Sequence, residues 1–132
     1  MNSLRMLEND DDDAAEVTLE DQNRISTFSK LNARVRNIEA KLEELKQEKE
    51  ALDDLTTELE LADEDEPVLY KVGETFLHMR LPQALKRLEK DQADVSAQLS
   101  SLSNTAEQYE KEMKELKVTL YAKFGSAINL DD

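Results

Sequence analysis

Apolar residues recur at alternating steps of three and four positions through the first half of the chain. A spacing of about 3.5 residues predicts an amphipathic helix that packs against a second helix in a coiled coil. This first stripe, which is polar at only two positions, consists of Phe28, Leu31, Val35, Ile38, Leu42, Leu45, Lys49, Leu52, Thr56 and Leu59. Thr18 can cap the helix, and Asp21 stands at the second position of a capping box. The pattern predicts a helix over residues 18–63.

The same spacing returns in the second half of the chain, with a single polar interruption. This second stripe consists of Leu81, Leu85, Leu88, Gln92, Val95, Leu99, Leu102, Ala106, Tyr109, Met113, Leu116 and Leu120. Pro82 is compatible with a first helical turn, where its missing N–H is not needed, and Gly125 suits the position just after a helix. A second helix is predicted over residues 82–124.

The two predicted helices are nearly equal in length, so the second can return antiparallel along the first. If Phe28 faces Leu116, the two stripes stay in phase and Leu31 faces Met113. A shift by one heptad would keep the same phase, so the apolar pattern alone leaves the register open. The short connection between the helices limits how far the register can shift.

Two runs of β-branched and aromatic residues separate the predicted helices and predict a β-hairpin over residues 67–79. Between the runs stands the pair Gly73-Glu74, which fits a two-residue type II′ turn. This register places on one face Val68, Tyr70, Val72, Leu77 and Met79. A turn at Val72-Gly73 is the alternative, so two registers stay open.

The predicted hairpin is interpreted as an assembly element. An isolated two-stranded hairpin is marginally stable in water, and its open edges and apolar face favour pairing with strands of other chains. The residues assigned to this role are Val68, Tyr70, Val72, Gly73, Phe76 and Leu77.

The composition agrees with long helices and argues against a compact enzyme. The 132 residues include two Gly, two Pro and no Trp, while 36% are charged. A compact globule needs more turn residues and an apolar core with several sides. The predicted fold class is mainly α, a long antiparallel two-helix coiled coil connected by a β-hairpin. No catalytic residues and no cofactor are expected, because two helices form no concave pocket that excludes water.

Residues 1–17 are predicted to be a disordered acidic tail, and residues 18–130 a single folded domain. The tail contains six consecutive acidic or amide residues, from Glu8 to Asp13, which repel one another and offer nothing to bury. Calcium binding by Asp10–Asp13 is disfavoured, because the run lacks the Gly and the distal Glu of an EF-hand loop.

The charge of the chain disfavours nucleic acid and membrane surfaces as partners. Lys and Arg number 17 against 31 Asp and Glu, which gives a formal net charge of −14, and this charge repels phosphates and anionic lipids. No metal site is expected at the lone His78 or at the acidic run 63–66, where consecutive like charges cannot converge on one ion. The absence of cysteine and of an apolar signal segment at the N-terminus predicts a cytoplasmic protein.

Three stretches resemble the prefoldin family. The hairpin segment 67–76, with its aromatic residue, glycine turn and following Phe, resembles the hairpin of the β-type subunits. Residues 120–130 are similar to the C-terminal end of such subunits, and residues 18–22 to the start of their first helix. The resemblance covers residues 18–130; the departure at Arg80-Leu81-Pro82 leaves the start of the second helix open.

The resemblance implies a subunit of a hexamer of two α-type and four β-type chains, joined through their hairpins into β-barrels. It implies an ATP-independent holdase that captures unfolded proteins, such as actin and tubulin, at the tips of its coiled coils and delivers them to the cytosolic chaperonin. A structural or tethering coiled coil is the alternative, although a tether has no use for an apolar hairpin. The client range, the neighbouring subunits and the residues that contact the chaperonin are left open.

Client binding is assigned to apolar residues near the open end of the predicted coil, where two helices have few neighbours. These residues are Ile25, Phe28, Leu120, Tyr121, Phe124 and Ile128. For Ile25 and Phe28 ordinary packing at the end of the coil is the alternative. Tyr121 and Ile128 lie off the main stripe and are expected to be exposed.

Overall fold

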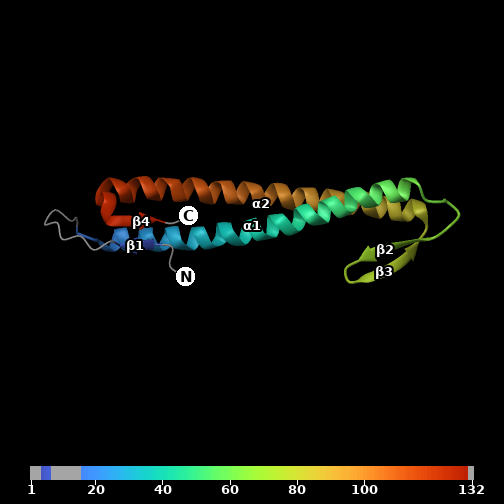
Figure 1. Cartoon of the computed structure of the whole chain (residues 1–132), viewed down its shortest axis with the longest axis horizontal. Coiled ribbons are helices and arrows are strands. Elements are labelled where there is room, and N and C mark those ends of the chain that lie inside the picture. Colours follow the sequence, from blue (N-terminus) through green and yellow to red (C-terminus); the bar gives the residue numbers. More distant parts are fainter. Residues whose placement is uncertain (1–3, 7–15, 131–132) are drawn as a thin grey trace. The chain divides into compact units, whose positions relative to one another are not determined.

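Two long helices make up most of the computed structural model, which describes residues 4–6 and 16–130 of the chain (Figure 1). The first helix, α1, spans Leu19–Glu60, and the second, α2, spans Leu81–Phe124. Neither helix, as far as the chain is described, contains a segment apolar enough to cross a membrane.

Short strands complete the fold. The strands β2 (Val68–Val72) and β3 (Thr75–Met79) form an antiparallel hairpin between the two helices. After α2, a single 3-10 turn, η1 (Gly125–Ala127), leads into β4 (Ile128–Leu130), which pairs antiparallel with β1 (Leu4–Met6). The predicted fold class, two long helices connected by a β-hairpin, is confirmed.

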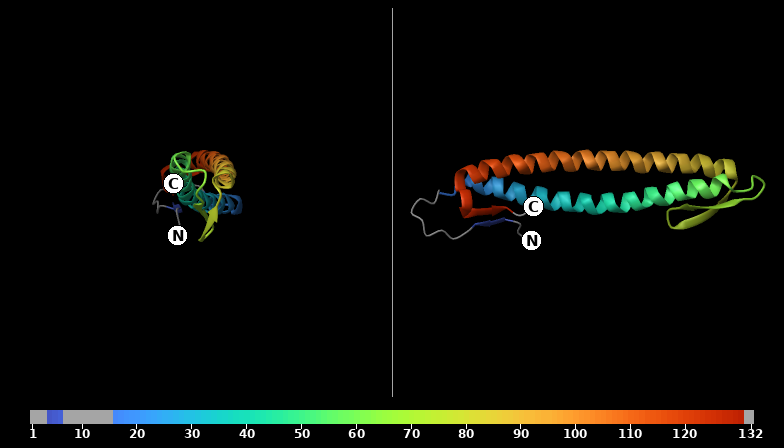
Figure 2. Two further views of the ribbon diagram at one scale, coloured as in Figure 1. Left: turned by 90° about the vertical axis from the view of Figure 1, so that its right-hand side faces the viewer. Right: turned by 45° about the horizontal axis from the view of Figure 1, so that its top comes forward.

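The chain forms two compact units, and each contains one segment of α1 and one segment of α2. The first unit comprises Met1–Ala40 and Ser103–Asp132, and the second comprises Lys41–Leu102. In each unit the two helix segments lie side by side and run in opposite directions (Figure 2). Each unit is therefore a helix pair to which short strands are added.

The register of the helices in the first unit agrees with the one that places Phe28 opposite Leu116. Lys117, the next residue along α2, has its Nζ atom 5.9 Å from the centre of the Phe28 ring. Two layers further on, where Val35 is expected to face Tyr109, the guanidinium carbon of the adjacent Arg34 lies 5.9 Å from the centre of the Tyr109 ring. The predicted register is confirmed in this unit.

In the second unit the polar position of the α2 stripe, Gln92, meets Thr56 of the α1 stripe. The Gln92 side-chain amide donates hydrogen bonds to Thr56 Oγ1 (3.0 Å) and to Asp53 Oδ1 (3.2 Å). The prediction that Leu85 belongs to the buried stripe is wrong, since this side chain is 39% exposed and Ala84 is fully buried in its place. Near the hairpin the stripe of α2 thus turns by one residue, toward the face that the hairpin covers.

The ends of the helices follow from local hydrogen bonds. The Asp21 N–H donates to Thr18 Oγ1 (3.2 Å) and the Thr18 N–H donates to Asp21 Oδ2 (3.0 Å), which confirms the predicted capping box. Helix α1 ends at Glu60, three residues earlier than predicted, because Leu61 and Ala62 make tighter bonds to carbonyls three residues back. Gly125 follows α2 in the left-handed conformation, with φ of +57°.

The N-terminal segment differs in part from the predicted disordered tail of residues 1–17. The backbone of Leu4–Met6 forms β1, because β4 offers it a strand edge with which to pair. Residues 1–3 and 7–15 of the predicted tail, including the disfavoured calcium ligands Asp10–Asp13, lie outside the described residues.

The hairpin has the Gly73-Glu74 turn, because Val72 pairs with Thr75 and Tyr70 pairs with Leu77. Gly73 has φ of +63°, and no other residue of the described hairpin has positive φ. A positive φ at the first turn residue only is the signature of a type II′ turn. The register predicted with Gly73-Glu74 in the turn is confirmed, and the alternative with Val72 in the turn is wrong.

Replacing Gly73 with Ala should destabilise the hairpin, because an L side chain in the left-handed region costs about 1 to 2 kcal/mol. We expect faster amide hydrogen exchange throughout β2 and β3, with little change elsewhere. Glu74→Ala is the matched control, since Glu74 has no positive φ. Equal exchange rates in the two variants would contradict the turn assignment.

Candidate functional site

One face of the hairpin packs on the chain's own helices. Tyr70 and Met79 are buried in a cluster whose other buried members are Leu59, Leu81, Ala84 and Leu88. Val68 and Val72, on the same face of the hairpin, are half-buried against this cluster. The inner face therefore belongs to the core of the second unit.

Tyr70 also ties the hairpin to α2 through a hydrogen bond. Its hydroxyl donates to Asp91 Oδ2 at 2.8 Å, and Arg87 Nε donates to Asp91 Oδ1 at 3.0 Å. Burial, followed by the hydrogen bond to Asp91, raises the pKa of Tyr70 well above its usual range. The hairpin is thereby held in one orientation on the helix.

The opposite face of the hairpin is exposed and partly apolar. It carries the cross-strand pairs Leu69 with His78 and Lys71 with Phe76. Phe76 is 61% exposed and Leu69 is 56% exposed, although both are large apolar side chains. The sheet contains only β2 and β3, so in the described chain both of its outer edges are unpaired. An apolar face with open edges is suited to receive further strands.

The structure divides the residues that the sequence assigned to assembly. Phe76 and Leu77 are exposed, Gly73 forms the turn, and Val68 and Val72 are half-buried. Tyr70 is buried against the chain's own helices, so it holds the hairpin in place and is not part of its exposed outer face. Leu69 was missed, although its odd-numbered position in β2 places it on the face opposite Tyr70 once the turn is fixed.

A second candidate surface surrounds the apolar cluster of the first unit. The buried members of this tip cluster are Phe28, Leu31, Val35, Met113, Leu120, Phe124, Ile128 and Leu130. The last two come from β4, because Gly125 reverses the chain after α2 and η1 brings the C-terminal segment back over the helices (Figure 2). The Leu130 N–H donates to the Tyr121 hydroxyl at 3.1 Å, which fixes the returning segment to α2.

Most of the residues predicted to bind clients are packed inside the tip cluster. Phe28, Leu120, Phe124 and Ile128 are buried, and Ile25 is half-buried against them. The expectation that Ile128 is exposed is wrong, because β4 packs it into the tip cluster. Tyr121 is 37% exposed, as expected.

Other apolar side chains of this unit are exposed and were missed. Leu19 is 72% exposed at the start of α1, and Val118 is 63% exposed near the end of α2. Both are apolar residues outside the 3.5-residue stripe, and that departure was the signal available in the sequence. With Val17 and Tyr121, each 37% exposed, they are the large apolar side chains that this unit exposes in its described part.

Asp21 links the start of α1 to the end of α2. Its carboxylate accepts a hydrogen bond from Lys123 Nζ and another from Arg24 Nη1 (3.1 Å), in addition to the capping N–H of Thr18. The bond from Lys123, followed by that from the Thr18 backbone, holds the pKa of Asp21 well below its usual range, against the opposing effect of burial. The carboxylate is therefore charged at neutral pH and bridges the two helix ends.

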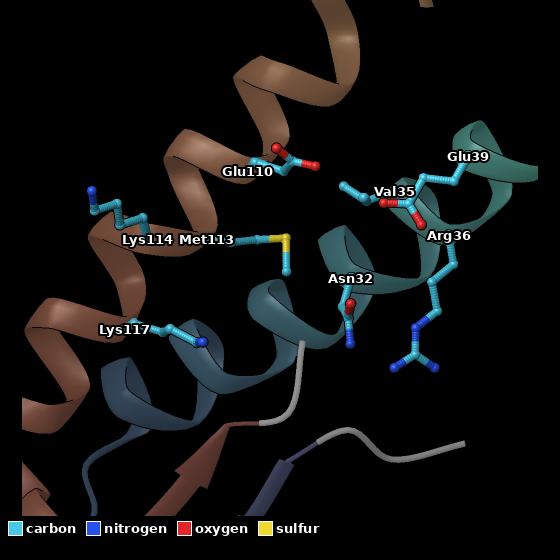
Figure 3. Close-up of a pocket in the computed structure, with 8 residues that line it drawn as sticks. All are labelled: Asn32, Val35, Arg36, Glu39, Glu110, Met113, Lys114 and Lys117. Atoms are coloured by element: carbon cyan, nitrogen blue, oxygen red, sulfur yellow. The ribbon is translucent and has the colours of Figure 1, made fainter. Parts of the chain in front are cut away.

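A groove of about 430 Å³ lies beside the tip cluster, between α1 and α2 (Figure 3). Its lining residues are Asn32, Val35, Arg36, Glu39, Glu110, Met113, Lys114 and Lys117. Val35 and Met113 extend toward one another from the two helices and form its apolar floor (Figure 3). The charged side chains at its rim are of mixed sign, which gives it no preference for a strongly charged ligand.

Acidic residues 63–66 form a turn of their own. The Asp63 side chain accepts the Asp65 N–H at 3.0 Å, and its backbone carbonyl accepts the Glu66 N–H at 3.2 Å. Across residues 4–6 and 16–130, no three His, Cys, Asp or Glu side chains gather in a way that could hold a metal ion. Asp63 therefore acts in local chain reversal.

Comparison with known proteins gives consistent similarities. A family model described as "Prefoldin subunit" matches residues 22–127. Prefoldin subunit 4 of Saccharomyces cerevisiae is 43% identical over 116 residues, which cover 88% of this chain and 90% of that protein. Probable prefoldin subunit 4 of Drosophila melanogaster is 36% identical over 127 residues, which cover 96% and 91%.

The fold is also similar to a solved structure. The crystal structure of the prefoldin beta subunit from Thermococcus strain KS-1 superposes with a TM-score of 0.70, covering 84% of this chain and 97% of that one. The sequences are only 14% identical, so this likeness bears on the fold alone.

Replacing Tyr70 with Phe should cost about 1 kcal/mol at neutral pH, because it removes one hydrogen bond to a partly exposed carboxylate. The raised pKa adds a pH dependence. In the wild type, stability from the protonated Tyr70 hydroxyl is fully present below pH of about 10 and is lost as the unfolded tyrosine ionises above it. The Phe variant lacks this loss, so the stability difference should shrink in alkali. Urea titrations from pH 7 to 11 measure it, with Tyr109→Phe as the control.

Replacing Asp21 with Asn should destabilise the first unit at pH 7, since the charged bridge to Lys123 and Arg24 is lost. The lowered pKa predicts that the wild-type advantage is present above the unfolded pKa of about 3.9 and disappears as the pH falls through and below it. Thermal melts of both proteins at pH 7 and pH 3 test this, with the exposed Glu20→Gln as the control. A difference that persists undiminished at pH 3 would contradict the electrostatic role.

Proposed function

The chain belongs to the prefoldin subunit family, and from this premise we propose that it is a β-type subunit of a hetero-hexameric co-chaperone. In this role the chain joins other prefoldin subunits through its hairpin. The complex acts as an ATP-independent holdase of the cytoplasm, and no cofactor takes part. Its clients are unfolded proteins, including actin and tubulin, which it delivers to the cytosolic chaperonin.

The observation that carries the proposal is the exposed outer face of the hairpin. Leu69 and Phe76 present large apolar side chains to solvent, next to two strand edges without partners in the described chain. Meanwhile Tyr70 and Asp91 hold the inner face on α2, so the outer face is presented in a fixed orientation. Such a preorganised surface loses little conformational freedom when strands of neighbouring subunits pair with it. A purely tethering coiled coil would gain nothing from it.

Client binding is proposed for the tip of the first unit. Tyr121 is available at the surface with Val118 and Leu19, while Phe28, Leu120, Phe124 and Ile128 form the packed layer beneath. Burial of one exposed apolar side chain contributes about 1.5 to 3 kcal/mol at most. Each tip therefore binds weakly, and useful capture requires several tips of one assembly on the same unfolded chain.

Assembly can be tested by replacing Phe76 with Asp and co-expressing the chain with the other prefoldin subunits. We expect native mass spectrometry to show a six-chain particle for the wild type and its loss for the variant. A carboxylate on the outer face would lose its hydration when neighbouring strands cover it, a cost of several kcal/mol that the cross-strand neighbour Lys71 offsets only in part. Circular dichroism should stay helical, because Phe76 does not contribute to the chain's own core.

Val118→Asp is the matched control for assembly. Val118 is 63% exposed and Phe76 is 61% exposed, so both changes place a new charge at a comparably exposed apolar position. The control should assemble normally. A wild-type chain that stays a defined monomer or homodimer among its partners would favour the tethering function, and full assembly of Phe76→Asp would exclude the hairpin as the joint.

A further inference from the structure

Strand β4 faces α2 with one edge and pairs with β1 along the other. Its burial alternates, with Ile128 and Leu130 in the tip cluster and Asn129 exposed. The Leu130 N–H donates to the Tyr121 hydroxyl, so the edge of β4 that carries this N–H faces α2. Because successive residues of a strand direct their N–H groups to opposite edges, the N–H and C=O of Asn129 point to the other edge.

This other edge is occupied by β1. The pairing is antiparallel and joins Leu4 with Leu130, Arg5 with Asn129, and Met6 with Ile128. Within this three-residue ladder the Arg5–Asn129 pair is the one whose backbone groups face each other for hydrogen bonding. A two-stranded sheet of this length is marginal in water, so backbone pairing by itself holds β1 only weakly.

The two strands of this sheet are therefore unequal. β4 has its own anchor in the tip cluster, where its apolar side chains are buried with Phe28, Leu120 and Phe124. β1 has the sequence Leu-Arg-Met and is connected to α1 through residues 7–18. Because β1 belongs to the same chain as β4, the two strands pair intramolecularly, at an effective concentration set by that linkage. Another extended segment can compete with β1 for the same edge.

We propose that the outer edge of β4 is a binding site for an extended peptide segment of an unfolded protein, and that β1 occupies it in cis until such a segment replaces it. The segment would add a strand to β4 through backbone hydrogen bonds to Asn129. The ligand is recognised by its extended backbone, as β1 is in the described pairing. This inference deepens the proposed holdase function and rests on it for the nature of the client.

Two proline substitutions test β1 and the edge of β4 separately, since proline lacks the N–H that a strand pair requires. Arg5→Pro removes the donor of β1, and Arg5→Ala is its control with the N–H retained. Asn129→Pro removes the donor of β4 itself, and Asn129→Ala is the corresponding control. Ile128, with φ of −129° and ψ of 142°, already has the extended conformation that a following proline demands.

The measurement uses the full chain assembled with its partner subunits. The first probe is a fluorescein-labelled synthetic peptide with the sequence of residues 3–7, followed by anisotropy. The second is reduced, carboxymethylated α-lactalbumin as a permanently unfolded client. Amide hydrogen exchange at residues 128–130 reports directly whether the edge of β4 is paired.

Arg5→Pro should bind the peptide about 3- to 10-fold more tightly than the wild type, because apparent affinity rises as the competent fraction of sites rises toward one. It should also speed amide exchange at Asn129. Arg5→Ala and Asn129→Ala should resemble the wild type. Asn129→Pro, alone or combined with Arg5→Pro, should abolish the gain while circular dichroism stays unchanged. Binding of the unfolded client should rank the variants in the same order as binding of the peptide.

Equal peptide affinity in Arg5→Pro, Arg5→Ala and the wild type would overturn the strand-exchange site, as would undiminished binding in the double proline variant. If these variants still hold the unfolded client, the proposed holdase function survives that result. If the peptide follows the expected order and no assembled form holds the client, the proposed function fails and the edge of β4 stands as a peptide site.

Discussion

A helix that packs against a single partner can bury only one stripe of its surface, and an apolar residue beside that stripe is buried only where another element covers it. In the first unit these contacts come from β4, which places Ile128 and Leu130 on the tip cluster. In the second unit they come from the hairpin, which places Tyr70 and Met79 on the neighbouring helices. Both additions are strands, and strands bring unpaired backbone edges with them. The packing requirement of a helix pair thus creates the two surfaces to which function is assigned.

Each addition is oriented by a hydrogen bond to α2. Apolar burial is non-directional and would hold a short strand in several positions, whereas hydrogen bonds are directional. The Asp91 carboxylate accepts hydrogen bonds from Tyr70 and Arg87 and so fixes the hairpin on α2. The Tyr121 hydroxyl accepts the Leu130 N–H and so fixes β4 on the same helix. These two bonds stabilise one arrangement of the strands among several that apolar packing would allow.

The sequence was most informative where a short-range rule determines the structure. The two stripes gave the helices, the Thr18–Asp21 spacing gave the cap, and Gly73-Glu74 gave the turn, because each depends on neighbours within a few positions. The burial of Ile128 depends on a chain reversal that brings β4 onto residues about a hundred positions away in sequence, and no local pattern encodes that contact. The prediction that Leu85 is buried was wrong for a related reason. The hairpin covers the face of α2 that contains Ala84, so tertiary packing shifts the buried stripe by one residue.

For the proposed holdase function, the burial of the tip residues limits how an unfolded chain could be held at the tip. The buried side chains of the tip cluster already pack against one another, so exposing them to a client would disrupt the core of the unit. These side chains include Phe28, Leu120, Phe124 and Ile128. A few exposed side chains such as Val118 and Tyr121 contribute little once the cost of immobilising a partner is subtracted. Backbone N–H and C=O groups, in contrast, are present in every extended chain regardless of its sequence. A protein that must recognise many unfolded chains gains breadth from pairing with backbones and retention from several weak tips acting together. On this reasoning the segment that closes the tip cluster also supplies its recognition edge, because the anchoring of Ile128 and Leu130 is what leaves the backbone of Asn129 directed outward.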